Sequence, residues 1–220
     1  VSQAAVSIGQ IDPKTYGDAA FTITVSGGSG EGAYSLTSSH PSILSLVKGD
    51  AAGEWTATIH KAGKGTLIAG KAEDDNYKPA TEVSVELEIK AKALNADEVT
   101  LEKDYNPTFT GEAFTPSVTV KDGEKTLVKG TDYEVTYKNN VNAGTATVTV
   151  AGKGNYTSSV EKTFTINKAS LAEKTPTIVG EAKVGGVLTA KLDGVAADQY
   201  TWTWYRNGNE ISGVTGASYV

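Results

Sequence analysis

The sequence predicts an all-β protein made of tandem antiparallel β-sandwiches, and two observations support this prediction. Runs in which apolar and polar residues alternate recur about every 8 to 15 residues, with Gly, Asp, Asn or Pro between them, and helical spacing is hard to find. A strand, a glycine turn and a second strand fill residues 142–166, and residues 62–89 contain an imperfect copy. Two matched copies indicate two tandem domains, whose sheets bury one face and leave the other in water.

Composition limits the functions that the chain can have. Its 220 residues are 39% hydrophobic and 21% charged, as in ordinary globular proteins. The net charge of -6 argues against a nucleic-acid surface. Cysteine is absent, which excludes thiolate catalysis and cysteine metal sites, and no apolar run approaches the roughly 20 residues of a membrane helix. The lack of methionine and of a leader before Val1 suggests a piece cut from a longer precursor.

The first unit is expected to contain strands whose apolar residues face one way. These sets are Phe21, Ile23 and Val25, then Trp55, Ala57 and Ile59, then Val83, Val85, Leu87 and Ile89. A glycine-rich stretch at residues 27–32 interrupts the first runs. A phosphate-binding loop would be followed by a helix and closed by Lys-Ser or Lys-Thr, and the sequence has neither. A flexible strand connection is therefore the better interpretation.

The second unit repeats the pattern, and its turns are marked locally. Its strand sets are Val118 and Val120, then Tyr133, Val135 and Tyr137, then Ala146, Val148 and Val150, then Phe164 and Ile166. Asp122-Gly123 predicts a two-residue hairpin turn, because both residues tolerate left-handed backbone, and Asn139-Asn140 is expected to turn the next pair. The inward positions expected across both units include Phe21, Ile23, Trp55, Ile59, Leu87, Tyr133, Val135, Val148 and Phe164.

Each unit closes on a lysine–alanine junction, at residues 92–94 and again at residues 168–171. These junctions predict domains at residues 1–91 and 92–168, followed by a partial third unit at residues 169–220. They contain no Gly or Pro and run almost directly into the next domain, unlike flexible Gly/Ser linkers. We therefore expect domains of about 35 to 45 Å stacked end to end as a monomeric rod.

Three motifs of the second unit, at residues 114–120, 129–133 and 142–156, resemble a repeat of bacterial immunoglobulin-like domains. Residues 14–18 and the ending around residues 75–77 resemble a related Tyr-Gly type of the same group, with longer loops. The resemblance covers roughly residues 10 to 168 and rests on turns and core positions. It implies tandem immunoglobulin-like sandwiches in an extracellular, cell-surface or secreted setting, and it carries over no catalytic residue.

From Ala169 onward the pattern changes and resembles another bacterial immunoglobulin-like repeat, in which a tryptophan strand meets an Asn-Gly hairpin. The strand is expected over residues 200–206 and the hairpin turn at Asn207-Gly208. The third unit, which runs to Val220, is shorter than the second unit. Two interpretations are open: a truncated domain, or a domain with a smaller sheet.

The chain has only two histidines, and neither is expected to act as a catalytic base. His40 precedes Pro41 in a predicted turn, and His60 alternates out of phase with the apolar residues before it, which places it on the wet face. Neither has an evident partner in the sequence, whereas a serine–histidine–carboxylate site needs a base pointed at a nucleophile.

Two loop motifs have a functional and a structural interpretation. The acids of Asp74-Asp75-Asn76 could offer oxygen ligands to calcium. At the matching position the second unit has Gly and Lys instead, followed by the same Asn-Tyr pair at Asn155-Tyr156, so a shared structural turn is favoured over calcium. Asn155-Tyr156-Thr157 also fits a glycosylation acceptor; here we expect it to be only a turn.

Aromatic residues and one lysine raise two further hypotheses. Trp202, Trp204 and Tyr205 could stack on a sugar, but a tryptophan on a sandwich strand is more often a core anchor, so at least one should be buried.

Lys162 falls in phase with Phe164 and faces inward if the strand is regular. A buried lysine must be paired or neutralised. The bacterial surface proteins that the chain resembles sometimes join such a lysine to an asparagine or aspartate; an edge strand with a bulge is the alternative.

Two classes of function remain from the sequence. One is a non-catalytic extracellular stalk or adhesion module that spaces a functional region from the cell, and the alternative is an accessory carbohydrate- or protein-binding module of a secreted enzyme. We predict no enzyme activity and assign no catalytic, cofactor-binding or metal residue. Whether the chain binds a protein or a glycan is left open by the sequence, and no nucleic-acid partner, cofactor or membrane span is expected. A binding module should expose aromatic residues around a groove, whereas a spacer should bury them.

Overall fold

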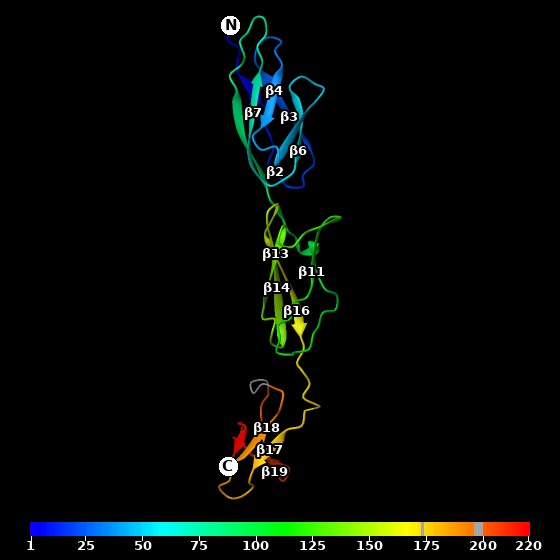
Figure 1. The fold of residues 1–220 in the computed structure, drawn as a ribbon, viewed down its shortest axis with the longest axis vertical. Coiled ribbons are helices and arrows are strands. Elements are labelled where there is room, and N and C mark those ends of the chain that lie inside the picture. Colours follow the sequence, from blue (N-terminus) through cyan, green and yellow to red (C-terminus); the bar gives the residue numbers. More distant parts are fainter. Residues whose placement is uncertain (173, 196–199) are drawn as a thin grey trace. The chain divides into compact units, whose positions relative to one another are not determined.

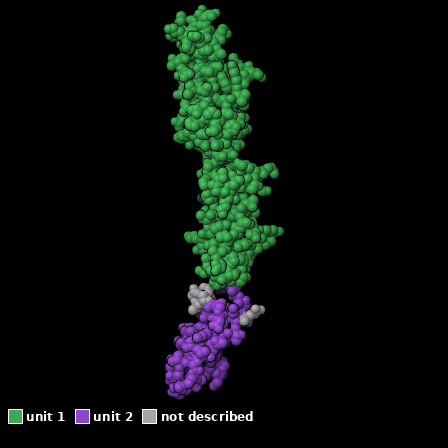
Figure 2. All heavy atoms as spheres, in the orientation of Figure 1, with its two compact units in different colours: residues 1–167 green, residues 168–220 purple. Residues whose placement is uncertain are grey.

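A computed structural model describes residues 1–172, 174–195 and 200–220. These residues form two compact units, residues 1–167 and residues 168–220, which are coloured separately in Figure 2. In the part of the chain that the structure describes, strands dominate, and no helix is long and apolar enough to cross a membrane. The prediction of an all-β protein is confirmed.

The first sandwich consists of two four-stranded sheets (Figure 1) with the orders β1-β3-β6-β5 and β2-β8-β7-β4. The strands of the first sheet are β1 (Val6–Ile8), β3 (Phe21–Gly27), β6 (Glu54–Ile59) and β5 (Leu44–Lys48). Those of the second sheet are β2 (Lys14–Thr15), β8 (Val83–Lys90), β7 (Gly63–Lys71) and β4 (Tyr34–Ser38). Neighbouring strands are antiparallel except β2 and β8, which are parallel.

The first apolar core confirms the predicted inward face with one exception. Ile23 and Trp55 are buried, and Phe21, Ile59 and Leu87 are partly buried and pack against the same core. Val85 departs from the predicted face and is 41% exposed. Strand β2 pairs with β8 only at Ile89 and Lys90, so at Val85 strand β8 is the edge of its sheet and its side chains are only partly covered.

The second sandwich consists of two three-stranded sheets with the orders β10-β11-β12 and β13-β14-β16. Their strands are β10 (Val99–Leu101), β11 (Val118–Asp122), β12 (Lys125–Thr126), β13 (Tyr133–Lys138), β14 (Gly144–Gly152) and β16 (Ser159–Ile166). A parallel pair, β9 (Lys92–Ala93) with β15 (Tyr156–Thr157), and a 3₁₀ turn, η1 (Ala96–Glu98), accompany them. Tyr133, Val148 and Phe164 are buried as predicted, and Val135 is partly buried against the same core.

The hairpin turns of the second sandwich lie close to their predicted positions. Strands β11 and β12 are joined by a two-residue turn, but Asp122 still pairs with Lys125, so the turn residues are Gly123 and Glu124 rather than Asp122 and Gly123. Only the glycine of this turn has a positive φ, of 58°. Between β13 and β14 the chain turns at Asn139, which has a φ of 57°, as predicted for Asn139-Asn140.

Residues 168–220 form a unit with a smaller sheet. Strands β17 (Thr177–Gly180), β18 (Leu188–Lys191) and β21 (Ser218–Tyr219) form an antiparallel sheet, and β19 (Tyr205–Arg206) with β20 (Asn209–Glu210) forms a hairpin. The predicted hairpin turn at Asn207-Gly208 is confirmed, and both residues have positive φ. The strand predicted over residues 200–206 is wrong except for Tyr205 and Arg206, because β19 pairs with β20 over only two residues.

The two junctions differ from one another. Strand β8 ends at Lys90 and β9 begins at Lys92, so a single residue separates the sheets of the first and second sandwiches, as the sequence predicts. After β16 ends at Ile166, the next strand begins only at Thr177. The prediction of an equally direct second junction is therefore wrong.

Candidate functional site at the first junction

Tyr16 follows the last residue of β2, at the end of the first sandwich, and its ring contacts the second sandwich. Strand β2 places it there: the backbone N–H of Tyr16 donates to the carbonyl of Lys90, 2.8 Å away, at the last residue of β8. Gly17 follows with a φ of +93°, a backbone conformation that favours glycine. Asp18 fixes the turn by accepting from the backbone N–H of Thr15 at 2.8 Å. The Lys-Thr-Tyr-Gly-Asp motif therefore forms a turn that holds Tyr16 at the end of the first sandwich.

Tyr16 meets a second tyrosine across the junction. Its ring lies edge-on to that of Tyr156, with centroids 5.5 Å apart and planes at 78°, an arrangement that the ring quadrupoles favour. Tyr156 is only 3% exposed. The Lys125 ammonium donates to the hydroxyl of Tyr16 at 3.2 Å and to that of Tyr156 at 3.4 Å. One lysine from the β11–β12 hairpin thus connects both sandwiches.

A charged network lies behind the buried tyrosine. The Tyr156 hydroxyl donates to Oδ2 of Asp122 at 3.0 Å, and Oδ1 of Asp122 forms an ion pair with Lys92. The hydrogen bond from Lys92 lowers the pKa of the Asp122 carboxyl, and the same hydrogen bond raises the pKa of Lys92. Burial, followed by the bond to Asp122, raises the pKa of the Tyr156 hydroxyl well above its usual range. At neutral pH the tyrosine is therefore a neutral donor to a charged carboxylate.

Asn155 adds a direct hydrogen bond between the two sandwiches. Its side-chain Oδ1 accepts from the backbone N–H of Ala62 at 2.9 Å, and its backbone carbonyl accepts from the N–H of Lys92 at 2.9 Å. Asn155 lies in a turn, as expected. The side chain that fits a glycosylation acceptor by sequence is half-buried and engaged in the junction.

These contacts define what we call the junction cluster: Tyr16, Ala62, Lys92, Asp122, Lys125, Asn155 and Tyr156. Its donors and acceptors satisfy one another, and it contains no nucleophile paired with a base. Its chemistry is that of a clamp between two domains. The sequence analysis singled out Lys92, Asp122, Asn155 and Tyr156 as junction or turn residues, but it did not bring them together, because the pairing depends on tertiary structure.

Both histidines have a serine partner that the sequence analysis did not find. His40 Nδ1 lies 2.8 Å from Ser39 Oγ, and His60 Nε2 lies 2.7 Å from Ser45 Oγ. All four residues are on the surface or half-buried, and His60 faces water as predicted. Among the described residues neither imidazole forms a salt bridge with a carboxylate that would orient it. These pairs therefore lack the third member of a catalytic triad.

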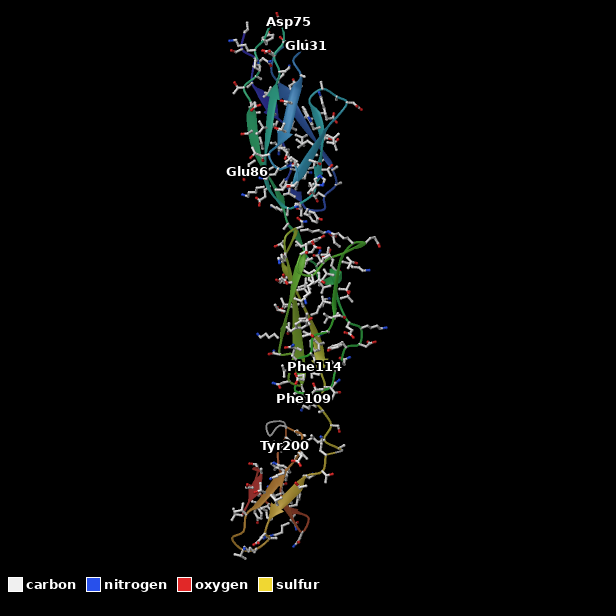
Figure 3. All side chains as sticks on the ribbon, viewed as in Figure 1. Glu31, Asp75, Glu86, Phe109, Phe114 and Tyr200 are labelled. Carbon is white, nitrogen blue, oxygen red and sulfur yellow. The ribbon has the colours of Figure 1, made fainter. Side chains whose placement is uncertain are left out.

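Asp74 closes a loop with its carboxylate. It accepts backbone N–H groups from Glu31 at 2.6 Å, Asn76 at 2.8 Å and Tyr77 at 2.9 Å. These hydrogen bonds, led by that from Asn76, lower its pKa. Figure 3 shows Glu31 and the neighbouring Asp75 at the same end of the first sandwich. In the described ranges of the chain no group of three or more acids and histidines is placed to hold a metal ion.

The glycine-rich loop is held by contacts rather than left loose. The Lys71 ammonium, on a residue only 8% exposed, donates to the carbonyl of Gly30 at 2.8 Å, and the N–H of Gly28 donates to Ala5 at 3.0 Å. The backbone N–H of Glu31 is bound to Asp74. The loop is a strand connection as predicted, and Lys71 from β7 and Asp74 from the loop after it hold its backbone by hydrogen bonds.

The aromatic residues of the C-terminal unit are divided between core and surface. Trp204 is 7% exposed and donates through Nε1 to the carbonyl of Gly216 at 2.9 Å, which confirms that at least one tryptophan is buried. Tyr205 is 61% exposed. Tyr200, labelled in Figure 3, and Trp202 are half-buried and pack edge-on with centroids 5.2 Å apart.

Lys162 lies on an edge strand. Strand β16 pairs with β14 alone in its sheet, and the lysine is half-buried, in phase with the buried Phe164. Among the described residues Lys162 forms no salt bridge. The edge strand of the sequence alternative is therefore present, but the bulge is not, because β16 pairs with β14 one to one from Ser159 to Ile166.

Comparisons with known proteins give limited information. No family model matches the chain, and no curated protein matches it by sequence. Among solved structures, extracellular cadherin domains 3–6 of protocadherin gamma B2 share 11% identity, with 80% of this chain and 53% of that chain covered and a TM-score of 0.32. InvD of Yersinia pseudotuberculosis shares 14% identity over 94% of this chain and 72% of that one, with a TM-score of 0.31. Domains 4 and 5 of the S-layer protein SbsC share 14% identity over 76% and 100%, with a TM-score of 0.28. The chain thus spans about half of the protocadherin fragment, and likeness at this level carries no argument about function.

Proposed function

We propose that residues 1–91 and 92–168 are two immunoglobulin-like modules of an extracellular, non-enzymatic spacer, followed by a partial third module at residues 169–220. The observation that carries this proposal is the junction cluster. Only Ala91 separates β8 from β9, and Tyr16, Asn155 and Lys125 bind across the junction. A junction built in this way fixes the direction of one module on the next, which is what a spacer requires and what independent binding modules do not.

The chemistry of the described surface supports a mechanical role over a catalytic one. The hollows of the described surface are small or open, and polar contacts such as those of Asp74, Lys125 and Asn155 join backbone segments or modules to one another. The acidic net charge of -6 fits a module that stays dispersed in solution. The setting at the cell surface or in the medium rests on the resemblance of the repeat motifs to bacterial surface domains.

Small-angle X-ray scattering of the whole chain at low concentration tests the spacer. We expect a pair-distance distribution with a long tail, since two modules of about 35 to 45 Å in series give a particle much longer than it is wide. A compact particle, with a radius of gyration close to that of a single globular domain of this size, would overturn the proposal.

An accessory binding module is the second candidate, and one observation favours it. In the C-terminal unit Tyr205 is 61% exposed, and the half-buried Tyr200 and Trp202 pack on each other. Aromatic faces of this kind stack on sugar rings. A glycan array with the whole chain distinguishes the candidates: binding that is lost in Tyr205→Ala and retained in Tyr219→Ala supports the binding module, and no binding at millimolar ligand supports the spacer.

A further inference from the structure

The strand registers of the two sandwiches match each other. Gly63 of β7 pairs with Ile89 of β8 in the first sandwich, and Gly144 of β14 pairs with Ile166 of β16 in the second. Each glycine begins its strand and has a positive φ, of 146° and 135° respectively. The two sandwiches are therefore structural repeats, and positions near the ends of the first have counterparts in the second.

Both sandwiches carry the features that the first one brings to the junction. The backbone N–H of Tyr16 donates at 2.8 Å to the last residue of β8, and that of Phe109 donates at 2.8 Å to the residue after β16. Ala62 and Ala143 each precede the glycine that begins the next strand. Figure 3 labels Phe109 at this end of the second sandwich. An aromatic ring and an alanine N–H thus recur together, and we call the pair Tyr16 and Ala62 the Tyr16 end.

The first residues of both sandwiches follow one hydrogen-bond pattern. In the second, the N–H of Lys92 donates to the carbonyl of Asn155 at 2.9 Å. In the first, the amino group of Val1 donates to the carbonyl of Asn76 at 3.2 Å, and the N–H of Lys78 donates to the carbonyl of Val1 at 2.8 Å. Val1 therefore has the place of Lys92, and Asn76 has the place of Asn155.

The Asn-Tyr turn is covered in the second sandwich and uncovered in the first. Asn155 accepts the N–H of Ala62 through Oδ1, and Tyr156 is only 3% exposed. Asn76 is exposed and Tyr77 is half-buried. Among the described residues the side chain of Asn76 forms no hydrogen bond and the ring of Tyr77 packs on no other aromatic ring. The first sandwich thus presents one half of a junction without the other half.

The surface around Asn76 is held in one conformation by the first sandwich itself. The Asp74 carboxylate accepts the backbone N–H groups of Asn76 and Tyr77 at 2.8 and 2.9 Å. The glycine-rich loop approaches the tyrosine ring so closely that a Cβ on Gly30 would lie 2.8 Å from its Cδ2. Figures 1 and 3 place the neighbouring Asp75 at the end of this sandwich where the N-terminus lies. A preformed surface loses little conformational entropy on binding, which favours docking.

We propose that the tip surface, defined by Val1, Asn76 and Tyr77, docks the Tyr16 end of another immunoglobulin-like sandwich held in series before Val1. The side chain of Asn76 accepts a backbone N–H equivalent to that of Ala62, and the ring of Tyr77 packs against a ring equivalent to that of Tyr16. This repeats, one position earlier, the arrangement at the first junction. The role of the contact rests on the proposed spacer, because it gives the first sandwich a fixed neighbour on each side.

A second copy of this chain fits the tip surface less well. Its Tyr16 end is already covered by its own second sandwich, through the contacts of the junction cluster. After its Phe109 end the chain continues to Ala169, which is the counterpart of Val1 in the register of the repeats, so two segments would compete for one position. A sandwich in series avoids both problems, because its own chain runs on into Val1.

A chain in which the first sandwich is duplicated tests the tip surface. Residues 1–91 are added directly before Val1, so that Ala91 of the added sandwich joins Val1 as Ala91 joins Lys92 in the natural chain. Glu86→Cys in both copies provides two spin-label sites, since Glu86 is exposed and the chain has no native cysteine. Double electron–electron resonance should give a distance distribution as narrow as that across the natural first junction.

Three substitutions in the duplicated chain separate docking from linker length. Asn76→Ala in the original sandwich removes the acceptor and should broaden the distribution, and Tyr16→Ala in the added sandwich removes the ring and should broaden it more. Asp50→Ala, at an exposed residue in the turn between β5 and β6 of the original sandwich, is the matched control and should leave the width unchanged. In the natural chain Asn76→Ala should leave the melting temperature unchanged, which excludes an effect on folding.

Three results would overturn the proposal. The first is a broad distribution in the duplicated chain without further substitution, and the second is a narrow one that neither Asn76→Ala nor Tyr16→Ala changes. The third is concentration-dependent sedimentation of the natural chain that Asn76→Ala abolishes, because it would assign the tip surface to a second copy. The spacer proposal survives all three, since scattering by the natural chain tests it independently.

Discussion

The two junctions of the chain have similar sequences and different structures. Ile89-Lys90-Ala91-Lys92-Ala93-Leu94 and Ile166-Asn167-Lys168-Ala169-Ser170-Leu171 both run from an isoleucine in the last two residues of a strand through lysine and alanine to leucine. In the first, Leu94 is 5% exposed and Lys92 pairs with Asp122; in the second, Leu171 is 38% exposed and Lys168 is exposed. The linker sequence is therefore not what orders a junction. Partners placed by the flanking sandwiches do this, and the first junction has Tyr16, Asn155 and Tyr156.

The largest expected difference between the junctions concerns their leucines. Leu94→Ala leaves a cavity in the second core and should cost about 2 to 5 kcal/mol, whereas the exposed Leu171→Ala should change stability by about 0.5 kcal/mol or less. Hydrogen exchange of the whole chain measures the destabilisation by Leu94→Ala as lost protection of the backbone amides in β13, β14 and β16. If the two variants lowered protection equally, burial at the junctions would not differ as described.

A smaller loss is expected on removing the hydroxyl of the buried tyrosine. Tyr156→Phe deletes the 3.0 Å hydrogen bond to Asp122 while leaving the Lys92–Asp122 pair in place. A hydrogen bond to a charged group contributes about 1.5 to 3 kcal/mol, and the remaining ion pair should keep the loss near the lower end. The matched control is Tyr205→Phe in the C-terminal unit, where the side chain is 61% exposed and no change is expected. Urea denaturation with m-values compared between the variants measures both.

The hydrogen bond from Ala62 to Asn155 should contribute still less. Asn155→Ala removes an acceptor from a half-buried N–H, and we expect a loss of about 1 kcal/mol together with faster exchange of the Ala62 amide. Asn142→Ala, in the exposed loop between β13 and β14, is the control and should leave that amide unchanged. Unaltered protection of Ala62 in Asn155→Ala would show that the bond does not hold the junction.

The pH dependence of the junction follows from the directions of its pKa shifts. The pKa of Asp122 is lowered from 3.8, so its stabilising effect is present above pH 3.8 and is lost as the pH falls through the lower folded-state value. The pKa values of Tyr156 and Lys92 are raised from 10.0 and 10.5, so their effect is complete below pH 10 and is lost at higher pH. The free energy of unfolding should be constant from about pH 5 to 9 and fall at lower and at higher pH. The fall at high pH should be smaller in Tyr156→Phe than in the unmodified chain, because that variant lacks one of the two groups that titrate there. Thermal melts across this range are the measurement.

The sequence predicts the fold better than the site, for physical reasons. Alternation in strands such as residues 21–25 and 146–150 reports burial directly, because a strand has one inward side. Turn residues such as Asn207-Gly208 indicate a positive backbone φ, which asparagine and glycine adopt more readily than other residues. The junction cluster could not be found in this way, since Tyr16 and Tyr156 are 140 positions apart in the numbering and meet only through tertiary packing. The serine partner of His60 was missed for the same reason, because Ser45 lies in another strand, whereas Ser39 is the residue directly before His40 and pairs with it locally. The short strand at Tyr205 depends on its pairing with β20.

Distance measurement between spin labels tests most directly the claim that the first junction is fixed by its cluster. Labels at Glu86→Cys and Lys138→Cys span the first junction, and labels at Lys138→Cys and Lys191→Cys span the second. All three positions are exposed and the chain has no native cysteine. Double electron–electron resonance should give a narrow distribution across the first junction, a broader one across the second, and a broadened first distribution in Tyr16→Ala. A first distribution as broad as the second, unchanged by Tyr16→Ala, would contradict the claim.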